Sequence, residues 1–335
     1  MIKLVEFGLL MAPKWPLQEI VKIYSYAEKL GIQYGWIADY ANSVNPYLAL
    51  TALAFNTKKM KLGTGVTNPY TRNPCIIAST IATIDETSNG RAILGIGAGD
   101  ETLLKSAGII RKSPSIMLRE SVEVIKLILK GEPVNYSGKM IKLSGFTLMF
   151  KPKRVVPIYI GARSPKMLQL AGEIGDGVLL DLSHHFEVKL SLDEVKKGVE
   201  KARKKISDID LATAVLFGIS KKEEEAWNSV RWCVALIAVS TSPKVLERHG
   251  ISFDDTKKVK EALEKGGLSQ AEPLVTEEML EAFSISGKPE YCVERIEELV
   301  KVGLNQINLA IIDFNLENIP KHLELFHKEV KPHFE

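Results

Sequence analysis

Short apolar runs alternate with longer amphipathic segments along nearly the whole chain. The apolar runs begin near residues 4, 34, 61, 91, 156, 177, 211 and 305, and each is followed by a segment of helical periodicity. Strands buried on both faces read as continuous apolar runs, and eight strand–helix alternations fit a TIM barrel better than a doubly wound sheet. We therefore predict an α/β fold, a single (β/α)8 barrel domain over residues 1–335.

Glycine and proline positions give the boundaries of the predicted elements. Strands are expected at 4–10, 34–38, 61–65, 91–96, 156–160, 177–180, 211–219 and 305–312. Helices are expected at 17–30, 46–56, 76–84, 114–130, 165–174, 192–206, 223–239, 290–302 and 316–330. Residues 134–143 are expected to form an added hairpin. Residues 241–288 break the rhythm with glycines and prolines, which predicts an insertion in a late βα connection, a lid or side wall over a pocket.

Composition excludes several classes of function. The chain carries a net charge of +3, with 45% apolar and 25% charged residues, and its Lys and Arg residues are scattered among acids. Such a mixed charge distribution is not typical of a nucleic-acid-binding or membrane-binding protein. The longest apolar runs are also far shorter than a membrane span of about 20 residues. Three cysteines without a paired spacing argue against a disulfide framework and a zinc site, so no metal is expected. We expect a cytoplasmic protein.

Residues 61–100 form the most regular part of the pattern, a complete βαβ unit. Its two strands end at glycines, in Gly65-Val66-Thr67-Asn68 and in Gly97-Ala98-Gly99-Asp100. Because ligands bind at the carboxyl ends of parallel strands, these two segments should face one pocket. Glycines there would let a flat ligand lie against bare backbone.

Side-chain chemistry at the strand ends is sparse. The chain has no Ser-His-Asp set, no carboxylate cluster, and neither a GxGxxG nor a GxxxxGK[ST] motif after a strand. This favours an enzyme whose cofactor carries the difficult step. The segment Gly161-Ala162-Arg163-Ser164 leads into a helix and either holds a phosphate or is an ordinary helix start with an exposed arginine. Asp39 and Asp100 follow strands, and each is either a ligand-binding acid or a turn and capping residue.

Several segments resemble one known family. LGTGVTNPYTRNPCIIASTIATIDETSNGRAILGIGAGD, WIADY, PIYIGARSPKMLQLAGEIGDGVLL, LERHGI and EAFSISGKPE are similar, in this order, to the methylenetetrahydromethanopterin reductases of the bacterial-luciferase-like superfamily. The resemblance implies coenzyme F420, with FMN as the alternative. It also implies hydride transfer to a tetrahydropterin that carries a one-carbon unit, and a homodimer or higher homo-oligomer.

The resemblance also implies roles for the candidate site residues. Gly65-Val66 would be a non-prolyl cis peptide behind the deazaflavin ring, and the neighbouring positions Thr67, Asn68, Gly97 and Gly99 would line the same coenzyme site. Asp39 and Asp100 would lie near the ring as candidate catalytic acids. The segment from Gly161 to Ser164 would take the coenzyme phosphate.

Two positions depart from the family pattern. Leu10 stands where the family has a glutamate thought to serve proton transfer to the pterin, and Tyr40 stands where it has a histidine. This chain therefore matches the family pattern better at the coenzyme site than at the substrate site. Three alternatives stay open: an F420-dependent enzyme with another substrate, an FMN-dependent monooxygenase, and a cofactor-binding protein without activity.

Overall fold

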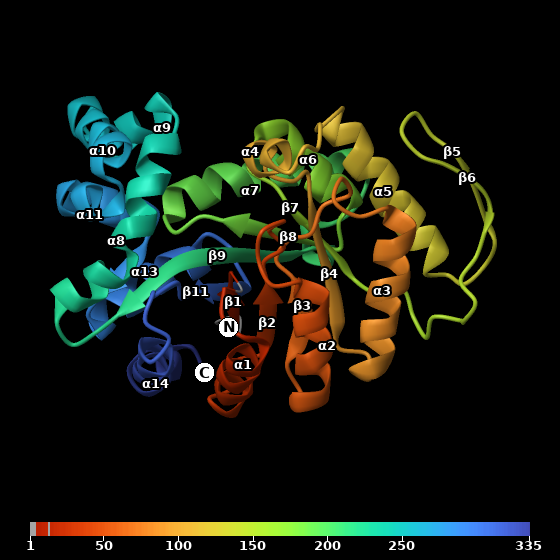
Figure 1. Cartoon of the computed structure of the whole chain (residues 1–335), viewed down its shortest axis with the longest axis horizontal. Coiled ribbons are helices and arrows are strands. Elements are labelled where there is room, and N and C mark those ends of the chain that lie inside the picture. The colour runs from red at the N-terminus through yellow and green to blue at the C-terminus, as the bar shows by residue number, and fades with distance from the viewer. Residues whose placement is uncertain (1–4, 13) are drawn as a thin grey trace. The chain divides into compact units, whose positions relative to one another are not determined.

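The computed structural model describes residues 5–12 and 14–335, which form two compact units (Figure 1). The N-terminal unit comprises residues 6–181 and 190–212, and the C-terminal unit comprises residues 182–189 and 213–335 together with Val5. Two elements, α7 (His185–Lys201) and β9 (Asp210–Ile219), run from one unit into the other.

The N-terminal unit contains six parallel strands in the order β1-β2-β3-β4-β7-β8. Its strands are β1 (Glu6–Met11), β2 (Tyr34–Ile37), β3 (Lys61–Thr64), β4 (Ala92–Gly97), β7 (Ile158–Gly161) and β8 (Gly177–Asp181). Its helices are α1 (Leu17–Lys29), α2 (Pro46–Asn56), α3 (Pro74–Thr87), α4 (Glu101–Ser106), α5 (Pro114–Ile128), α6 (Pro165–Ile174) and the short 3-10 helix η1 (Ile206–Asp208). Since the strands are parallel and in register, with Gly97 beside Gly161, their carboxyl ends meet at one edge.

The strands of this unit are buried on both faces, which agrees with their continuous apolar sequences. One interior cluster contains Tyr34, Trp36, Ile93, Tyr159, Leu179 and Ala212. The Trp36 ring lies parallel to that of Tyr34, with centroids 6.2 Å apart, and is 5.4 Å from the ring of Tyr159. Leu10 and Val66 pack against this cluster, which connects it to the candidate site.

The predicted hairpin is present as β5 (Val134–Ser137) and β6 (Lys142–Phe146), a separate antiparallel pair beyond α5 (Figure 1). Glu120 of α5 anchors its turn. The Glu120 carboxylate accepts the backbone N–H groups of Lys139, Met140 and Ile141 at 2.7–2.9 Å. The turn is therefore fixed to α5 by hydrogen bonds that a shorter or neutral side chain could not reproduce.

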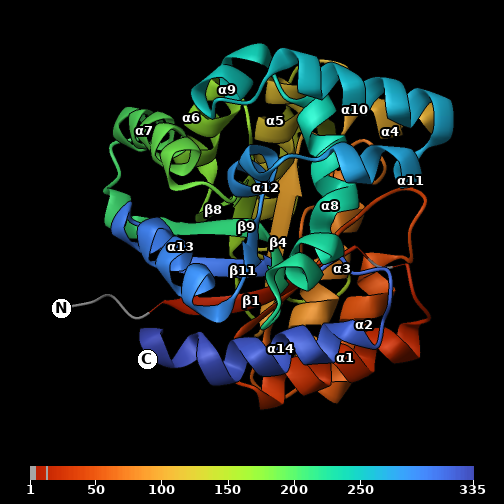
Figure 2. The ribbon, with the colours of Figure 1, turned by 90° about the vertical axis from the view of Figure 1, so that its left-hand side faces the viewer.

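The C-terminal unit contains a smaller sheet in the order β10-β9-β11 and a group of helices around α8 (Figure 2). Its elements, in addition to β9, are α8 (Glu223–Ser240), α9 (Pro243–Arg248), α10 (Phe253–Gly266), α11 (Leu268–Ala271), η2 (Glu272–Leu274), α12 (Glu277–Phe283), β10 (Ile285–Gly287), α13 (Pro289–Lys301), β11 (Gln306–Ala310), α14 (Asn318–Glu329) and η3 (Lys331–Phe334).

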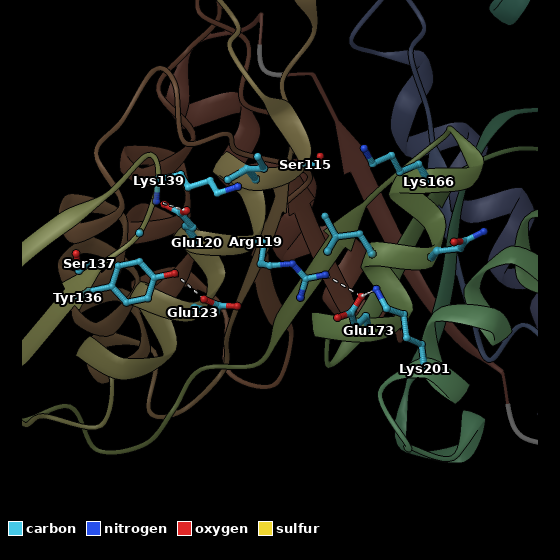
Figure 3. Close-up of a pocket in the computed structure, with 14 residues that line it drawn as sticks. Ser115, Arg119, Glu120, Glu123, Tyr136, Ser137, Lys139, Lys166, Glu173 and Lys201 are labelled. Atoms are coloured by element: carbon cyan, nitrogen blue, oxygen red, sulfur yellow. Dashed lines mark hydrogen bonds and ion pairs between the residues drawn. The ribbon is translucent and has the colours of Figure 1, made fainter.

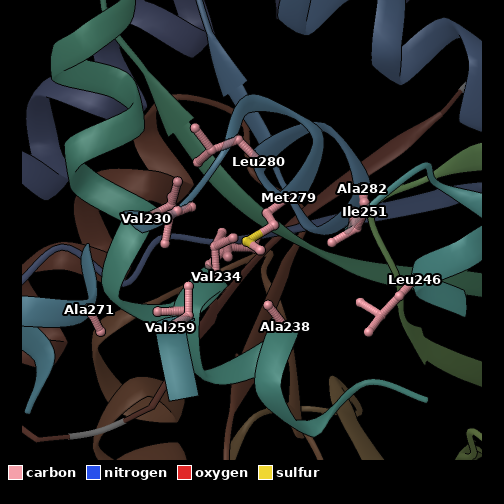
Figure 4. Packing of buried hydrophobic residues seen from close by; sticks show 13 residues of the cluster. Val230, Val234, Ala238, Leu246, Ile251, Val259, Ala271, Met279, Leu280 and Ala282 are labelled. Atoms are coloured by element: carbon pink, nitrogen blue, oxygen red, sulfur yellow. The ribbon is translucent and has the colours of Figure 1, made fainter. Parts of the chain in front are cut away.

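Residues 241–288, the predicted insertion, pack on α8. Val230, Val234 and Ala238 of α8 meet apolar side chains of α9, α10, α11 and α12, and Met279 lies within this cluster (Figure 4). The interval ends in β10, which pairs in parallel with β9 and therefore belongs to the sheet. The role of the remaining residues as a lid stays a prediction.

Three histidines pack together at the end of α9 and the first turn of α7, and one of them contacts α13. The His184 ring stacks on His185, with centroids 4.6 Å apart, and meets His249 edge-on at 4.5 Å. His185 Nδ1 lies 2.9 Å from a carboxylate oxygen of Glu298, and the Nε2 atom of His249 lies 3.3 Å from Glu187. Burial, followed by the charges of Arg295 and the two other histidines, lowers the pKa of His184 to about 3.

This lowered pKa makes the protein sensitive to acid. An unfolded histidine has a pKa near 6.5, so between about pH 6.5 and 3 the unfolded chain binds the extra proton and stability falls as the pH drops. We expect His184→Gln to reduce the loss of unfolding free energy between pH 7 and pH 5 by about 1 kcal/mol, after allowance for solvent screening. Urea unfolding at both pH values measures it, with the exposed His333→Gln as control. Equal losses in wild type and His184→Gln would contradict the assignment.

Most predicted elements are present, with boundaries shifted by a few residues. The predicted strand 4–10 corresponds to β1, although Leu4 lies outside the described residues. Helix α4 was not predicted, because six residues give too little periodicity. The prediction of a helix at 192–206 was wrong at both ends. The Phe186 N–H donates to His184 Nδ1 at the start of α7, and Arg203, at φ 57°, lies in the turn that follows it.

In the described part of the chain, no helix has the length and apolar character that crossing a membrane requires.

Candidate active site

Val66 lies at the centre of the carboxyl edge of the N-terminal unit. A Cβ atom added to Gly97 would lie 3.0 Å from Val66 Cγ2, and one added to Gly161 would lie 2.9 Å from the same atom. The contact at Gly161 is closer than real Cβ atoms approach other atoms, and the contact at Gly97 is at the tight limit, so the glycines leave room for the valine side chain. Val66 therefore occupies one side of Gly97 and Gly161, and the expectation that a ligand lies against bare backbone at Gly65 and Gly97 stays a prediction.

Gly65 is needed for a similar reason. Its Cβ atom would lie 3.1 Å from Leu10 Cδ1 and 3.1 Å from Trp36 Cβ. The peptide bond between Gly65 and Val66 is cis. Leu10, Gly65 and Val66 thus form an apolar ledge, a name kept below for these three residues, at the ends of β1 and β3.

Asp39, just after β2, is held in a buried ion pair beside this ledge. Its Oδ2 atom accepts the Thr67 hydroxyl at 2.6 Å and pairs with the Arg72 guanidinium. The Asp39 side chain is only 4% exposed. Thr67 is itself fixed by backbone hydrogen bonds to Gly95 and Gly97. The Asp39 carboxylate is therefore held by Thr67 and Arg72, two residues of the segment that follows the ledge.

Sequence reasoning missed Arg72 and Tyr47. The Arg72 guanidinium lies over the Tyr47 ring, 4.8 Å from its centroid, and burial raises the pKa of Tyr47. Neither residue is in a strand. Arg72 lies in the loop before α3, and Tyr47 lies in the first turn of α2. The only signal for Arg72 would have been the burial of Asp39, because a buried carboxylate requires a cationic partner. Burial, however, is not visible in the sequence.

Asp100 and Asn68 have local structural roles. Asp100 is the N-cap of α4, and its Oδ1 atom accepts the Leu103 N–H at 2.9 Å. Asn68 Oδ1 accepts the N–H groups of Tyr70 and Thr71 at 3.1 and 3.0 Å. Gly99 has φ 73°, a left-handed conformation that glycine adopts readily. The Asp100 side chain is exposed at the rim, so capping does not remove it from reach of a ligand.

The segment from Gly161 to Ser164 ends β7 and starts α6. Ser164 is the N-cap of α6 without a side-chain capping bond, and Pro165 occupies the first helical position. Arg163 pairs with Asp181 at the end of β8. The Asp181 charge raises the pKa of Arg163, and Tyr40 and Asp100 act in the same direction, which places all three near the guanidinium. Arg163 therefore already has an anionic partner that a bound phosphate would have to share.

The structure thus brings the predicted residues to one edge in two groups. Leu10, Val66 and Asp39 belong to a partly buried group around the ledge. Arg163 and Asp100 belong to an exposed, charged group that also includes Tyr40 and Asp181. A planar ligand with an apolar ring and an anionic side chain matches this division.

Comparison with known proteins assigns the chain to a family. The luciferase-like monooxygenase family model matches residues 4–306. The 5,10-methylenetetrahydromethanopterin reductase of Archaeoglobus fulgidus is 42% identical, with 90% of this chain and 92% of that relative covered. The enzyme of the same name from Methanopyrus kandleri is 38% identical, with 98% and 99% covered.

Solved structures agree on the fold. The coenzyme F420 dependent tetrahydromethanopterin reductase from Methanopyrus kandleri superposes with a TM-score of 0.94 at 37% identity, covering 99% of both chains. An F420-dependent secondary alcohol dehydrogenase, at 21% identity and a TM-score of 0.80, shares the fold alone. The predicted (β/α)8 barrel of the bacterial luciferase-like type is confirmed. The chain belongs to the luciferase-like monooxygenase family, and within it to the group formed by its 5,10-methylenetetrahydromethanopterin reductase relatives.

Proposed function

We propose that this protein is an F420-dependent reductase of a methylene-tetrahydropterin, the reaction after which its relatives are named. The observation that carries the proposal is the identity of 38–42% to three such reductases over 90% or more of the chain. Relatives named F420-dependent glucose-6-phosphate dehydrogenase reach only 26–27%. The pterin substrate is therefore better supported than a sugar phosphate.

The residues at the carboxyl edge fit a deazaflavin. The ledge offers the apolar surface that a flat tricyclic ring needs on one face. Asp39 supplies a fixed anionic acceptor for a ring N–H group, and the α6 start with Arg163 and Ser164 supplies donors for a phosphate. When bound, the deazaflavin would supply or accept the hydride, so the protein need not provide a redox group of its own.

The chain's own residues then bind, orient and handle protons. Leu10 and Val66 exclude water from one face of the ring. Because Asp39 is ion-paired with Arg72, we assign it to binding and orientation. The exposed Asp100, whose Oδ2 atom is not used in capping, is the candidate that could hold a proton for the substrate.

Titration of the purified protein with F420 and with FMN, followed by assay of reduced F420 with methylene-tetrahydropterins, tests this function. We expect quenching of deazaflavin fluorescence on binding and pterin-dependent oxidation of the reduced coenzyme. Asp100→Asn should lower turnover at least tenfold with little change in coenzyme affinity. Binding of FMN without binding of F420 would overturn the proposal. Binding of F420 without turnover of any pterin would overturn the proposed activity and favour a cofactor-binding protein.

We further propose that the chain forms a homodimer through the outer faces of α2 and α3. Leu48 and Phe55 of α2 are 64% and 75% exposed, and Ile76 of α3 is 58% exposed. Neither α2 nor the first eleven residues of α3 carry a charge, and the Thr80 and Thr83 hydroxyls donate to carbonyls of their own helix. Such an uncharged exposed surface is typical of an interface.

Sedimentation of a charged variant tests the dimer. We expect Phe55→Glu to shift the protein to monomer, because a carboxylate would be buried without a partner in the interface. Phe253→Glu, at an exposed phenylalanine of α10, is the matched control and should leave the assembly unchanged. A monomeric wild-type protein, or a dimer insensitive to Phe55→Glu, would contradict the proposed surface.

We place the protein in the cytoplasm, in keeping with its composition. Within the described residues, Cys75, Cys233 and Cys292 form no disulfide bond, which is usual for cysteines in a reducing compartment.

A further inference from the structure

Asp181 lies beside the phosphate segment, the name used here for residues 161–164. Strands β7 and β8 pair in parallel, with Gly161 next to Leu179. Arg163 follows Gly161 by two residues and Asp181 follows Leu179 by two, so the register brings both side chains to the same part of the carboxyl edge. Their charged groups form an ion pair. Asp181 therefore places a carboxylate next to the start of α6.

The ion pair leaves Arg163 able to bind a second anion. Its contact with Asp181 uses only the Nη2 atom, whereas a guanidinium has five N–H donors. The side chains of Arg163 and Asp181 are 78% and 58% exposed, so a phosphate held at Ser164 can reach the remaining donors. A bound phosphate would thus share Arg163 with Asp181 and would lie close to the Asp181 carboxylate.

The other charges near the phosphate segment do not offset Asp181. Asp100 is a second carboxylate whose charge acts on the Arg163 guanidinium. Lys166, the next cation along the chain, lines a groove of about 660 Å³ between α5, the hairpin turn and α6 (Figure 3). That groove also contains three carboxylates, from Glu120, Glu123 and Glu173. The phosphate segment thus has one arginine facing two carboxylates, a balance that favours an anion of low charge.

We propose that Asp181 is a specificity-determining residue, which favours the phosphodiester of coenzyme F420 over the phosphomonoester of FMN. This inference rests on the proposed function. The phosphate of F420 is esterified on both sides and carries one negative charge. The phosphate of FMN is terminal and carries about 1.5 to 2 negative charges at pH 7. Because repulsion by the Asp181 carboxylate grows with the charge of the phosphate, FMN loses more affinity than F420 does.

Fluorescence titration of the full-length protein with F420, and with FMN and riboflavin as competitors, tests the proposal. At low salt we expect Asp181→Asn to raise the affinity for F420 about threefold and that for FMN about tenfold. Asp181→Lys should extend both gains in the same direction. The affinity for riboflavin, which lacks the phosphate, should stay unchanged. Added salt should reduce both gains, because the ion pair is exposed.

Asp193→Asn and Asp193→Lys are the matched controls. Asp193 is a half-exposed acid of α7 that pairs with Lys196 of the same helix. Its substitutions change the net charge of the protein by the same amounts as those of Asp181. They should leave the affinities for F420, FMN and riboflavin unchanged.

The outcomes separate the two proposals. If F420 does not bind the wild-type protein, the proposed function fails and the role of Asp181 fails with it. If F420 binds, but the Asp181 variants fail to raise the affinity for FMN more than that for F420, only the role of Asp181 is overturned. Equal gains in the Asp193 variants would also overturn it, since the net charge of the protein would then explain them.

Discussion

Arg72→Met is expected to lower the free energy of unfolding by about 3–5 kcal/mol, because the Asp39 carboxylate would remain buried without its cation. Thr67 would still donate one hydrogen bond to Asp39, but a hydroxyl does not neutralise a charge. We also expect coenzyme affinity to fall at least tenfold, since Asp39 would lose its fixed orientation. Urea unfolding and fluorescence titration measure the two effects.

Two further variants identify the cause of such a loss. Arg72→Met combined with Asp39→Asn removes the buried charge, so it should recover most of the stability while coenzyme binding stays weak. Arg111→Met removes the pair with Glu101, whose side chain is exposed, and one hydrogen bond to the Gly99 carbonyl, and should cost no more than about 2 kcal/mol. If Arg72→Met were as mild as Arg111→Met, the buried ion pair would not be the support of this site.

Gly161→Ala is expected to destabilise the protein by about 1–3 kcal/mol and to abolish tight coenzyme binding. The new Cβ atom would lie 2.9 Å from Val66 Cγ2 and 3.1 Å from Val66 Cγ1, so Val66 would have to move. Because Val66 is part of the ledge, its displacement would disturb the surface on which we place the deazaflavin. Thermal unfolding and fluorescence titration report the two consequences.

A second substitution separates packing from binding. Val66→Ala in the Gly161→Ala background removes the methyl groups that clash, so it should restore stability. It should not restore coenzyme affinity, because the ledge would lack its valine. Full recovery of both properties would mean that Val66 only fills space and does not support the ligand.

Much of the fold could be predicted from the periodicity of the chain. The α2 start at Pro46, the α6 end at Ile174 and the β9 end at Ile219 agree with the sequence prediction, because proline, glycine and uninterrupted apolar runs act locally. The predictions failed where local signals were weak. Helix α4 is only about a turn and a half long, and α7 begins at His185, seven residues before the predicted start at residue 192.

The location of the candidate site could be predicted from the sequence, but the contacts between its side chains could not. Counting strand ends located Asp39, Gly65, Gly97 and Gly161 at one edge, as the register of the parallel strands shows. It could not show that Val66 fills the space beside the glycines. Nor could it show that Arg72, a loop residue 33 positions after Asp39, neutralises that aspartate.

The amino-acid sequence alone therefore determined the alternation of strands and helices and the edge at which a ligand would bind, because both follow from interactions between near neighbours in the chain. Tertiary structure alone decided which side chains touch at that edge and which charges pair there. The contacts of Asp39 with Arg72 and of Val66 with Gly161 depend on burial and on distances between distant segments, and neither quantity is encoded in local periodicity.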